Sequence, residues 1–172
     1  DGEKMSKSLG NFWTISEILN KIDPLVLRFS LINAHYRSPI DMNEQLLKDA
    51  QKNHTRLMGV YKAALELRGI NCPPLPVGDL TSHVPLVKSL GLLEKMAQGF
   101  AMAMDDDFNS REGCAKVLGA LREMSRMLGI LEGDDLGAYA QHCVDWLEDT
   151  AGSVLGVLPS REQTLAEPEE DP

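Results

Sequence analysis

Residues 43–68, NEQLLKDAQKNHTRLMGVYKAALELR, form the longest amphipathic stretch of the sequence. Mostly apolar side chains recur in it at spacings of three and four residues: Leu47, Ala50, His54, Leu57, Tyr61 and Ala64. This spacing places them on one face of an α-helix. At 1.5 Å per residue the helix should be about 35–40 Å long. Because its apolar face has to pack against other helices, the stretch predicts a helical bundle.

Three later segments show the same spacing and are predicted helices. The first covers about 83–104, through Leu86, Leu90, Leu93, Ala97, Phe100 and Met104. The second begins where Asn109 stands three residues before Glu112, and it runs through Cys114, Val117, Leu118, Leu121 and Leu128. The third covers about 135–157, through Leu136, Tyr139, Cys143, Trp146 and Val154. Long helices with short connections predict an all-α fold, an antiparallel helix bundle with little or no strand.

Two shorter helices should precede the bundle. Thr14 stands three residues before Glu17, which is a capping-box pattern. Asp23 can cap a second helix whose first position is Pro24, extending to about residue 34. The proline in the segment 35–39 ends that helix, because the residue before a proline avoids helical angles.

Charge and composition narrow the possible functions. The net charge is -9 over 172 residues, with +2 in residues 1–70 and -11 in residues 71–172. An acidic chain argues against generic nucleic-acid binding, so a polyanionic partner would bind the first seventy residues. No apolar run approaches the roughly 18 residues that cross a membrane. Three well-separated cysteines, Cys72, Cys114 and Cys143, favour a reducing, cytoplasmic location over a disulfide scaffold.

Residues 4–8 spell KMSKS, with Gly2 before them and Leu-Gly-Asn at 9–11 after them. When a carboxylate attacks the α-phosphate of ATP, negative charge develops on the departing pyrophosphate. Flexible ammonium groups can follow that charge into the transition state. A lysine-rich surface turn is the alternative interpretation. The motif resembles the nucleotide signature of class I aminoacyl-tRNA synthetases, and the chain opens inside it, so we expect a segment of a longer protein.

Three further segments resemble the cysteinyl-tRNA synthetase family in order and spacing, over residues 1 to about 130. They are Leu-Arg-Phe at 27–29, His-Tyr-Arg-Ser-Pro at 35–39 and Met-Asp-Asp-Asp-Phe-Asn at 104–109. The resemblance implies a bundle of the class Ia synthetase anticodon-binding type, preceded by the lysine loop and stem-contact helices. It implies the end of the catalytic domain at 1–42, the tRNA-binding bundle at 43–158 and an acidic disordered tail at 159–172.

The resemblance also implies functional residues. Lys7 is the catalytic lysine that lies on the ATP phosphates, and Met5 seats the adenine through its backbone. Lys4, Ser6 and Ser8 complete the ATP-binding loop. Contacts with tRNA are expected from Arg37, Lys48, Lys52 and Arg56. For Arg37, a plain capped turn at the end of a helix is the alternative.

The whole enzyme implied by this resemblance uses ATP with Mg, L-cysteine and cysteine tRNA, and it acts as a monomer. It also holds a zinc ion whose ligands lie outside this chain. The HIGH motif of the family, its zinc ligands and its anticodon-reading subdomain do not occur here. We therefore expect the missing N-terminal catalytic domain as a partner, no cofactor bound to this segment, and no activity from the segment alone.

No metal site is expected in the chain itself. The aspartates 105–107 should lie at the positive end of the helix that follows them. His54 suits a core or edge position, and His142 with Cys143 supplies too few ligands for structural zinc. Two other functions remain open. One is the related ligase that joins cysteine to an amino sugar in mycothiol synthesis, and the other is a non-enzymatic helical bundle.

Overall fold

The computed structural model describes residues 14–68 and 81–166, and every regular element in those two ranges is helical. This confirms the predicted all-α fold. The short helices α1 (Ile15–Leu19) and α2 (Pro24–Ile32) precede α3 (Glu44–Leu67). After a 3-10 turn, η2 (Thr81–His83), come α4 (Val84–Asp105), α5 (Ser110–Leu128) and α6 (Gly133–Leu147). A π turn, η3 (Glu148–Gly152), and a last helix, α7 (Arg161–Leu165), follow.

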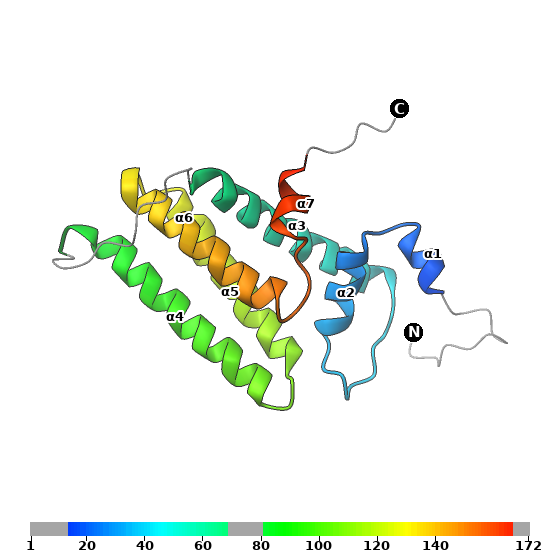
Figure 1. Ribbon diagram of the computed structural model, residues 1–172. Coiled ribbons are helices and arrows are strands. Elements are labelled where there is room, and N and C mark those ends of the chain that lie inside the picture. The colour runs from blue at the N-terminus through cyan, green and yellow to red at the C-terminus, as the bar shows by residue number, and fades with distance from the viewer. Residues whose placement is uncertain (1–13, 69–80, 167–172) are drawn as a thin grey trace.

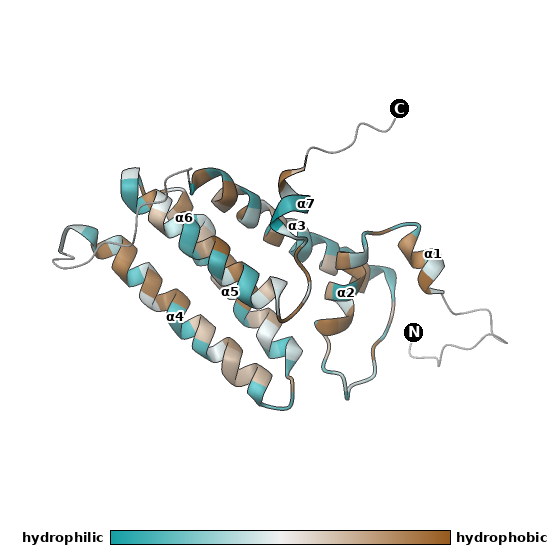
Figure 2. Cartoon of the chain, in the orientation of Figure 1, coloured by the Kyte–Doolittle hydropathy of each residue, from teal (hydrophilic) through white to brown (hydrophobic). Residues whose placement is uncertain are grey.

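Helices α3, α4, α5 and α6 form the bundle, in which α5 packs against both α4 and α3 and α6 packs against α3 (Figure 1). Helix α2 packs against α3, and α1 lies beyond it at the same end of the molecule. Apolar and polar residues alternate along the bundle helices (Figure 2), as expected for helices that bury one face. Within the described ranges, no helix has both the length and the apolar character needed to cross a membrane.

Side-chain caps begin the helices, and the caps predicted at Thr14, Asp23 and Asn109 are confirmed. The Thr14 hydroxyl accepts from the Glu17 N–H at 3.2 Å, and the Glu17 carboxylate accepts from the Thr14 N–H at 2.8 Å. Three more caps each accept a backbone N–H on a side-chain oxygen: Asp23 for α2, Asn43 for α3 and Asn109 for α5. These bonds satisfy donors that the first turn of a helix leaves without a partner.

The core lies between the bundle helices and includes α2. The predicted face of α3 is buried from Ala50 to Ala64, and Val26 and Phe29 of α2 are 0% exposed in the same cluster. His54, expected at a core or edge position, is 6% exposed, and its Nε2 lies 3.0 Å from the Val157 carbonyl oxygen. Every fully buried side-chain nitrogen or oxygen in the described residues has a hydrogen-bond partner, so none of them bears the cost of an unpaired polar group.

The helix predicted at 135–157 is wrong in its C-terminal part. Helix α6 ends at Leu147 and continues as the π turn, in which the Ser153 N–H donates to the Glu148 carbonyl at 2.7 Å. A π-type hydrogen bond joins residues five apart instead of four, so the turn contains one extra residue. The side chains that follow are therefore shifted around the helix axis by about the angle between two neighbouring residues. Val154, expected in the core, is therefore 51% exposed, whereas Leu155 is 4% exposed.

The expected disorder from residue 159 is wrong for residues 161–165, which form α7. Ser160 and Gln163 make a capping box at its start. Arg161 then pairs with both oxygens of Glu148, at 2.9 and 2.7 Å, and Tyr61 donates to Glu148 at 2.6 Å. Burial and the Glu148 carboxylate raise the pKa of Tyr61 to about 12, so the phenol stays protonated and remains a donor.

The aspartates 105–107 do not lie at the positive end of α5 as expected. Asp105 is the last residue of α4 and Asp106 is its C-cap, so two of the three lie at a negative helix end. Asp107 and Phe108 have φ values of 57° and 52°, in the left-handed region. Each such non-glycine residue costs on the order of 1–3 kcal/mol.

Gly156 offers a test of how α2 is joined to the end of the bundle. Its φ is +65°, and a Cβ there would lie 2.9 Å from Nε of Arg28, which donates to the Leu155 carbonyl at 2.7 Å. We expect Gly156→Ala to lower the free energy of unfolding by about 1–3 kcal/mol, from backbone strain and loss of that bond. Urea denaturation measures the change. Gly59→Ala, in an open helical position, is the control and should stabilise by up to about 1 kcal/mol.

Candidate functional site

The five residues predicted to bind ATP, Lys4, Met5, Ser6, Lys7 and Ser8, lie outside the described residues. The described chain begins at Thr14, the N-cap of α1. The candidate site in the described residues consists of the surfaces that follow the lysine loop directly in sequence, on α1, α2 and the first half of α3.

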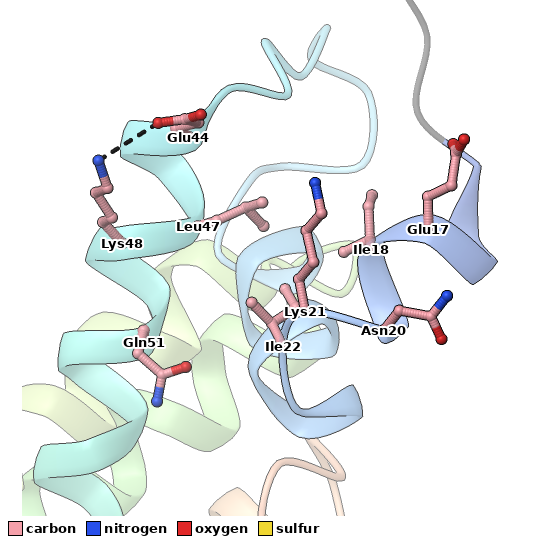
Figure 3. Close-up of a pocket in the computed structure, with 9 residues that line it drawn as sticks. All are labelled: Glu17, Ile18, Asn20, Lys21, Ile22, Glu44, Leu47, Lys48 and Gln51. Atoms are coloured by element: carbon pink, nitrogen blue, oxygen red, sulfur yellow. Dashed lines mark hydrogen bonds and ion pairs between the residues drawn. The ribbon is translucent and has the colours of Figure 1, made fainter.

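A groove of about 640 Å³ lies between α1, the α1–α2 connection and the start of α3 (Figure 3). Apolar side chains from all three segments contribute to it, namely Ile18, Ile22 and Leu47. The polar side chains that line it are Glu17, Asn20, Lys21, Glu44, Lys48 and Gln51. The groove is therefore apolar at its centre and charged at its edge.

Two ammonium groups lie at this groove. In Figure 3 the Lys21 side chain extends between Ile18 and Leu47, and Lys48 points to Glu44 across one helical turn, at 3.4 Å. The Lys48–Glu44 pair is exposed and contributes little to stability. The Glu17 carboxylate accepts from the N–H and hydroxyl of Thr14, and these bonds hold its pKa below the usual range. Two lysines and two glutamates therefore line the groove, so its charged residues balance and its apolar side chains supply the surface on which a chain segment could pack.

Three of the four predicted tRNA contacts share one face of α3. Lys48, Lys52 and Arg56 follow one another at four-residue intervals and are all exposed. The opposite face, including Leu57 and Tyr61, is 0% exposed in the core. Burial of that face fixes the rotation of the helix, and so it directs the row of cations outward. Such a row can pair with phosphates spaced along a nucleic-acid backbone.

The fourth predicted contact, Arg37, does not belong to this row. It lies in the loop between α2 and α3, which reaches the α4–α5 turn (Figure 1). There Nη2 of Arg37 pairs with Oδ2 of Asp107 at 2.9 Å, and the Tyr36 hydroxyl donates to Oδ1 of Asp107 at 2.7 Å. The hydrogen bond to Asp107 raises the pKa of Tyr36. Two segments that carried the family resemblance thus meet in one contact.

Sequence reasoning missed two parts of this geometry. The contact of Asp107 with Tyr36 and Arg37 joins residues about 70 positions apart, and local sequence patterns do not predict contacts at that separation. Lys21 had a weak signal, because it stands between the turn residue Asn20 and the apolar Ile22 directly after a capped helix. A lysine in that position can extend along an apolar surface while its ammonium stays in water.

The remaining titratable candidates have structural surroundings. Cys114 and Cys143 are free thiols at 0% exposure, and burial raises the pKa of each to about 12. Burial also lowers the pKa of the half-buried His142. Over residues 14–68 and 81–166, no three His, Cys, Asp or Glu side chains lie close enough together to hold a metal ion.

The sequence is similar to known proteins over most of its length. Residues 1–52 match the family described as tRNA synthetases class I (C) catalytic domain. The chain is 44% identical over 161 residues to a cysteine–tRNA ligase of Syntrophotalea carbinolica, covering 92% of this chain and 31% of that protein. A cysteine–tRNA ligase of Ectopseudomonas mendocina is 40% identical over 162 residues, and one of Geobacter metallireducens is 36% identical over 168 residues. These matches cover 92% and 97% of this chain and 28% and 33% of those proteins, so the chain spans about a third of its relatives' length.

The reactivity of the buried thiols Cys114 and Cys143 tests how tightly the core is packed around them. At pH 8, groups with pKa values of about 12 are almost entirely protonated, and a buried thiol cannot reach a reagent. In a Cys72→Ser variant, we expect no rapid reaction of the native protein with Ellman's reagent and reaction of both remaining thiols in urea. A thiol that reacts within seconds in the native protein would contradict the packing around Cys114 or Cys143.

Proposed function

We infer that this chain supplies the ATP-phosphate lysine loop and a tRNA-docking bundle to a cysteine–tRNA ligase. It belongs to the cysteinyl-tRNA synthetase family over the segment that it shares with its relatives. The observation that carries the proposal is 44% identity with such a ligase across 92% of this chain. The whole protein would join L-cysteine to cysteine tRNA with ATP, as a cytoplasmic monomer. The relatives compared above are all named cysteine–tRNA ligases, which favours this function over the mycothiol ligase.

We propose a division of labour along the chain. Residues 1–42 close the catalytic domain, residues 43–158 form the RNA-docking bundle and residues 159–172 form a tail, of which 161–165 are helical. The family match ends at residue 52, inside α3, and supports a catalytic segment that runs directly into the bundle.

The lysine loop would act on the leaving group of adenylate formation. The carboxylate of cysteine attacks the α-phosphate of ATP, the bond to the β,γ-pyrophosphate breaks, and charge develops on the departing oxygens. Lys7 would stabilise that charge, with Lys4 in support, while Met5, Ser6 and Ser8 hold the adenine and the loop. Such an interaction is strongest in the transition state, so it lowers the barrier more than it tightens ATP binding.

The bundle would hold the RNA by its phosphate backbone. Lys48, Lys52 and Arg56 form the outward row on α3, and Arg37 lies at the neighbouring loop. The chain as a whole carries -9, so this local row has to overcome a repulsive background. Contact with tRNA should therefore depend on these few side chains and on salt.

Magnesium and zinc enter no step proposed for this chain. The resemblance implies both metals for the whole enzyme, with Mg bound to ATP. Among the described residues, no three His, Cys, Asp or Glu side chains lie together as a metal site. The role proposed for this chain is to place positive charge on the ATP phosphates and on the tRNA backbone.

Lys7→Ala in the whole enzyme tests the role of the loop. Loss of a charge that acts in the transition state should slow cysteine-dependent pyrophosphate exchange ~30- to 1000-fold, equivalent to about 2–4 kcal/mol. The Kd of ATP should change much less, because the ground state carries less charge on the pyrophosphate oxygens. Equal losses in rate and in ATP affinity would make Lys7 a simple binding residue.

The double variant Lys52→Ala with Arg56→Ala tests the docking row. We expect KM for tRNA in aminoacylation to rise at least ~10-fold and the slope of log affinity against log salt to fall by about 2, one for each lost phosphate contact. Lys95→Ala with Arg122→Ala removes the same charges from α4 and α5, where both side chains are exposed, and is the control. Equal changes in KM and salt slope in both variants would show that these cations act only through the overall charge of the protein and make no specific contact with tRNA.

A further inference from the structure

The α4–α5 turn holds an exposed carboxylate in a strained backbone conformation. Asp107 and the following Phe108 both have positive φ, at 57° and 52°, and neither is glycine. Backbone hydrogen bonds close the turn, among them that from the Asn109 N–H to the Ala103 carbonyl at 2.9 Å. Aspartate tolerates this left-handed conformation better than phenylalanine, so the strain lies mainly at Phe108, and an outlier of this kind points to a role for the turn that it shapes.

The carboxylate of Asp107 organises two side chains on a distant loop. Oδ1 accepts from the Tyr36 hydroxyl at 2.7 Å, and Oδ2 pairs with Nη2 of Arg37 at 2.9 Å. The Arg37 guanidinium also lies 5.4 Å from the centre of the Tyr36 ring, whose other neighbour, His35, is stacked on it at 5.0 Å. The Arg37 head group is therefore held by a carboxylate and an aromatic ring together.

Stability alone does not explain this arrangement. The side chains of Arg37 and Asp107 are 67% and 44% exposed, and ion pairs in that setting add little to folding. The contact instead removes rotational freedom from a long cationic side chain. A guanidinium has five N–H donors in a planar fork, and Asp107 takes an interaction at only one of its nitrogens. The rest of the fork remains on an exposed surface.

We propose that Asp107 is a positioning residue for RNA binding, which holds the Arg37 guanidinium and the Tyr36 phenol so that Arg37 pairs with a phosphate of the tRNA backbone. The proposal rests on the function proposed above. Asp107 leaves part of the guanidinium fork available for that phosphate, because its Oδ2 pairs with Nη2 of Arg37 while its Oδ1 accepts from the Tyr36 hydroxyl.

The test is the tRNA affinity of the whole enzyme carrying Asp107→Asn, measured by fluorescence anisotropy. Asparagine tolerates positive φ, so the turn should be kept. Electrostatics alone predicts tighter binding, because a negative charge is lost next to a polyanion. Loss of positioning predicts the opposite, a roughly three- to tenfold weaker Kd and a salt slope smaller by about 1. Asp106→Asn, which removes the same charge from the preceding exposed C-cap, should leave the Kd unchanged or slightly lower.

A double-variant cycle with Arg37→Ala identifies the route of the effect. If Asp107 acts through Arg37, Asp107→Asn should add no further loss in the Arg37→Ala protein. Additive losses, or a fall in thermal midpoint that accounts for the weaker binding, would make the role structural and overturn the proposal. Tighter or unchanged binding by Asp107→Asn would also overturn it. A wild-type enzyme that does not bind tRNA would refute the proposed function itself, before either variant is compared.

Discussion

The apolar face of α2 attaches the N-terminal part of the described chain to the bundle. Val26 and Phe29 on this face lose all solvent contact among side chains of the bundle. Removing such side chains from water contributes about 1.5–3 kcal/mol each. Arg28, between them in sequence, donates to the carbonyl of Leu155, which lies just after the π turn. The helix is thus fixed on one side by burial and on the other by a charge-assisted hydrogen bond. The α2–α3 loop and the start of α3 depend on that position.

Function in this fold is placed on the outer sides of elements whose inner sides are buried. Helix α3 buries Leu57 and Tyr61 and directs its cations to solvent, so packing and recognition use opposite faces of one helix. The loop that carries Arg37 lacks such a core, and it takes its position from Asp107 on the α4–α5 turn. The first surface is oriented by the hydrophobic effect, and the second by a polar contact at its edge.

Local patterns predicted the helices and their starts because those depend on neighbours in sequence. Thr14, Asp23 and Asn109 cap the helices that follow them, as predicted from their neighbours in sequence, and Asn43 caps α3 in the same way. The apolar spacing failed near Val154, where the π turn changes the rotation per residue while the sequence keeps its three-four pattern. The contact between Arg37 and Asp107 could not be predicted, because it depends on how two distant turns approach in space. The lysine loop remains a prediction from its motif alone.

The burial of α2 also bears on how such proteins can be rearranged during evolution. Recombination preserves a protein most easily at a breakpoint that few contacts cross. The family match ends at residue 52, but a breakpoint there would divide α3, and one at residue 42 would separate Val26 and Phe29 from the core that they fill. The catalytic segment and the bundle are therefore expected to be inherited together. Exchange of modules should be confined to positions outside this shared core.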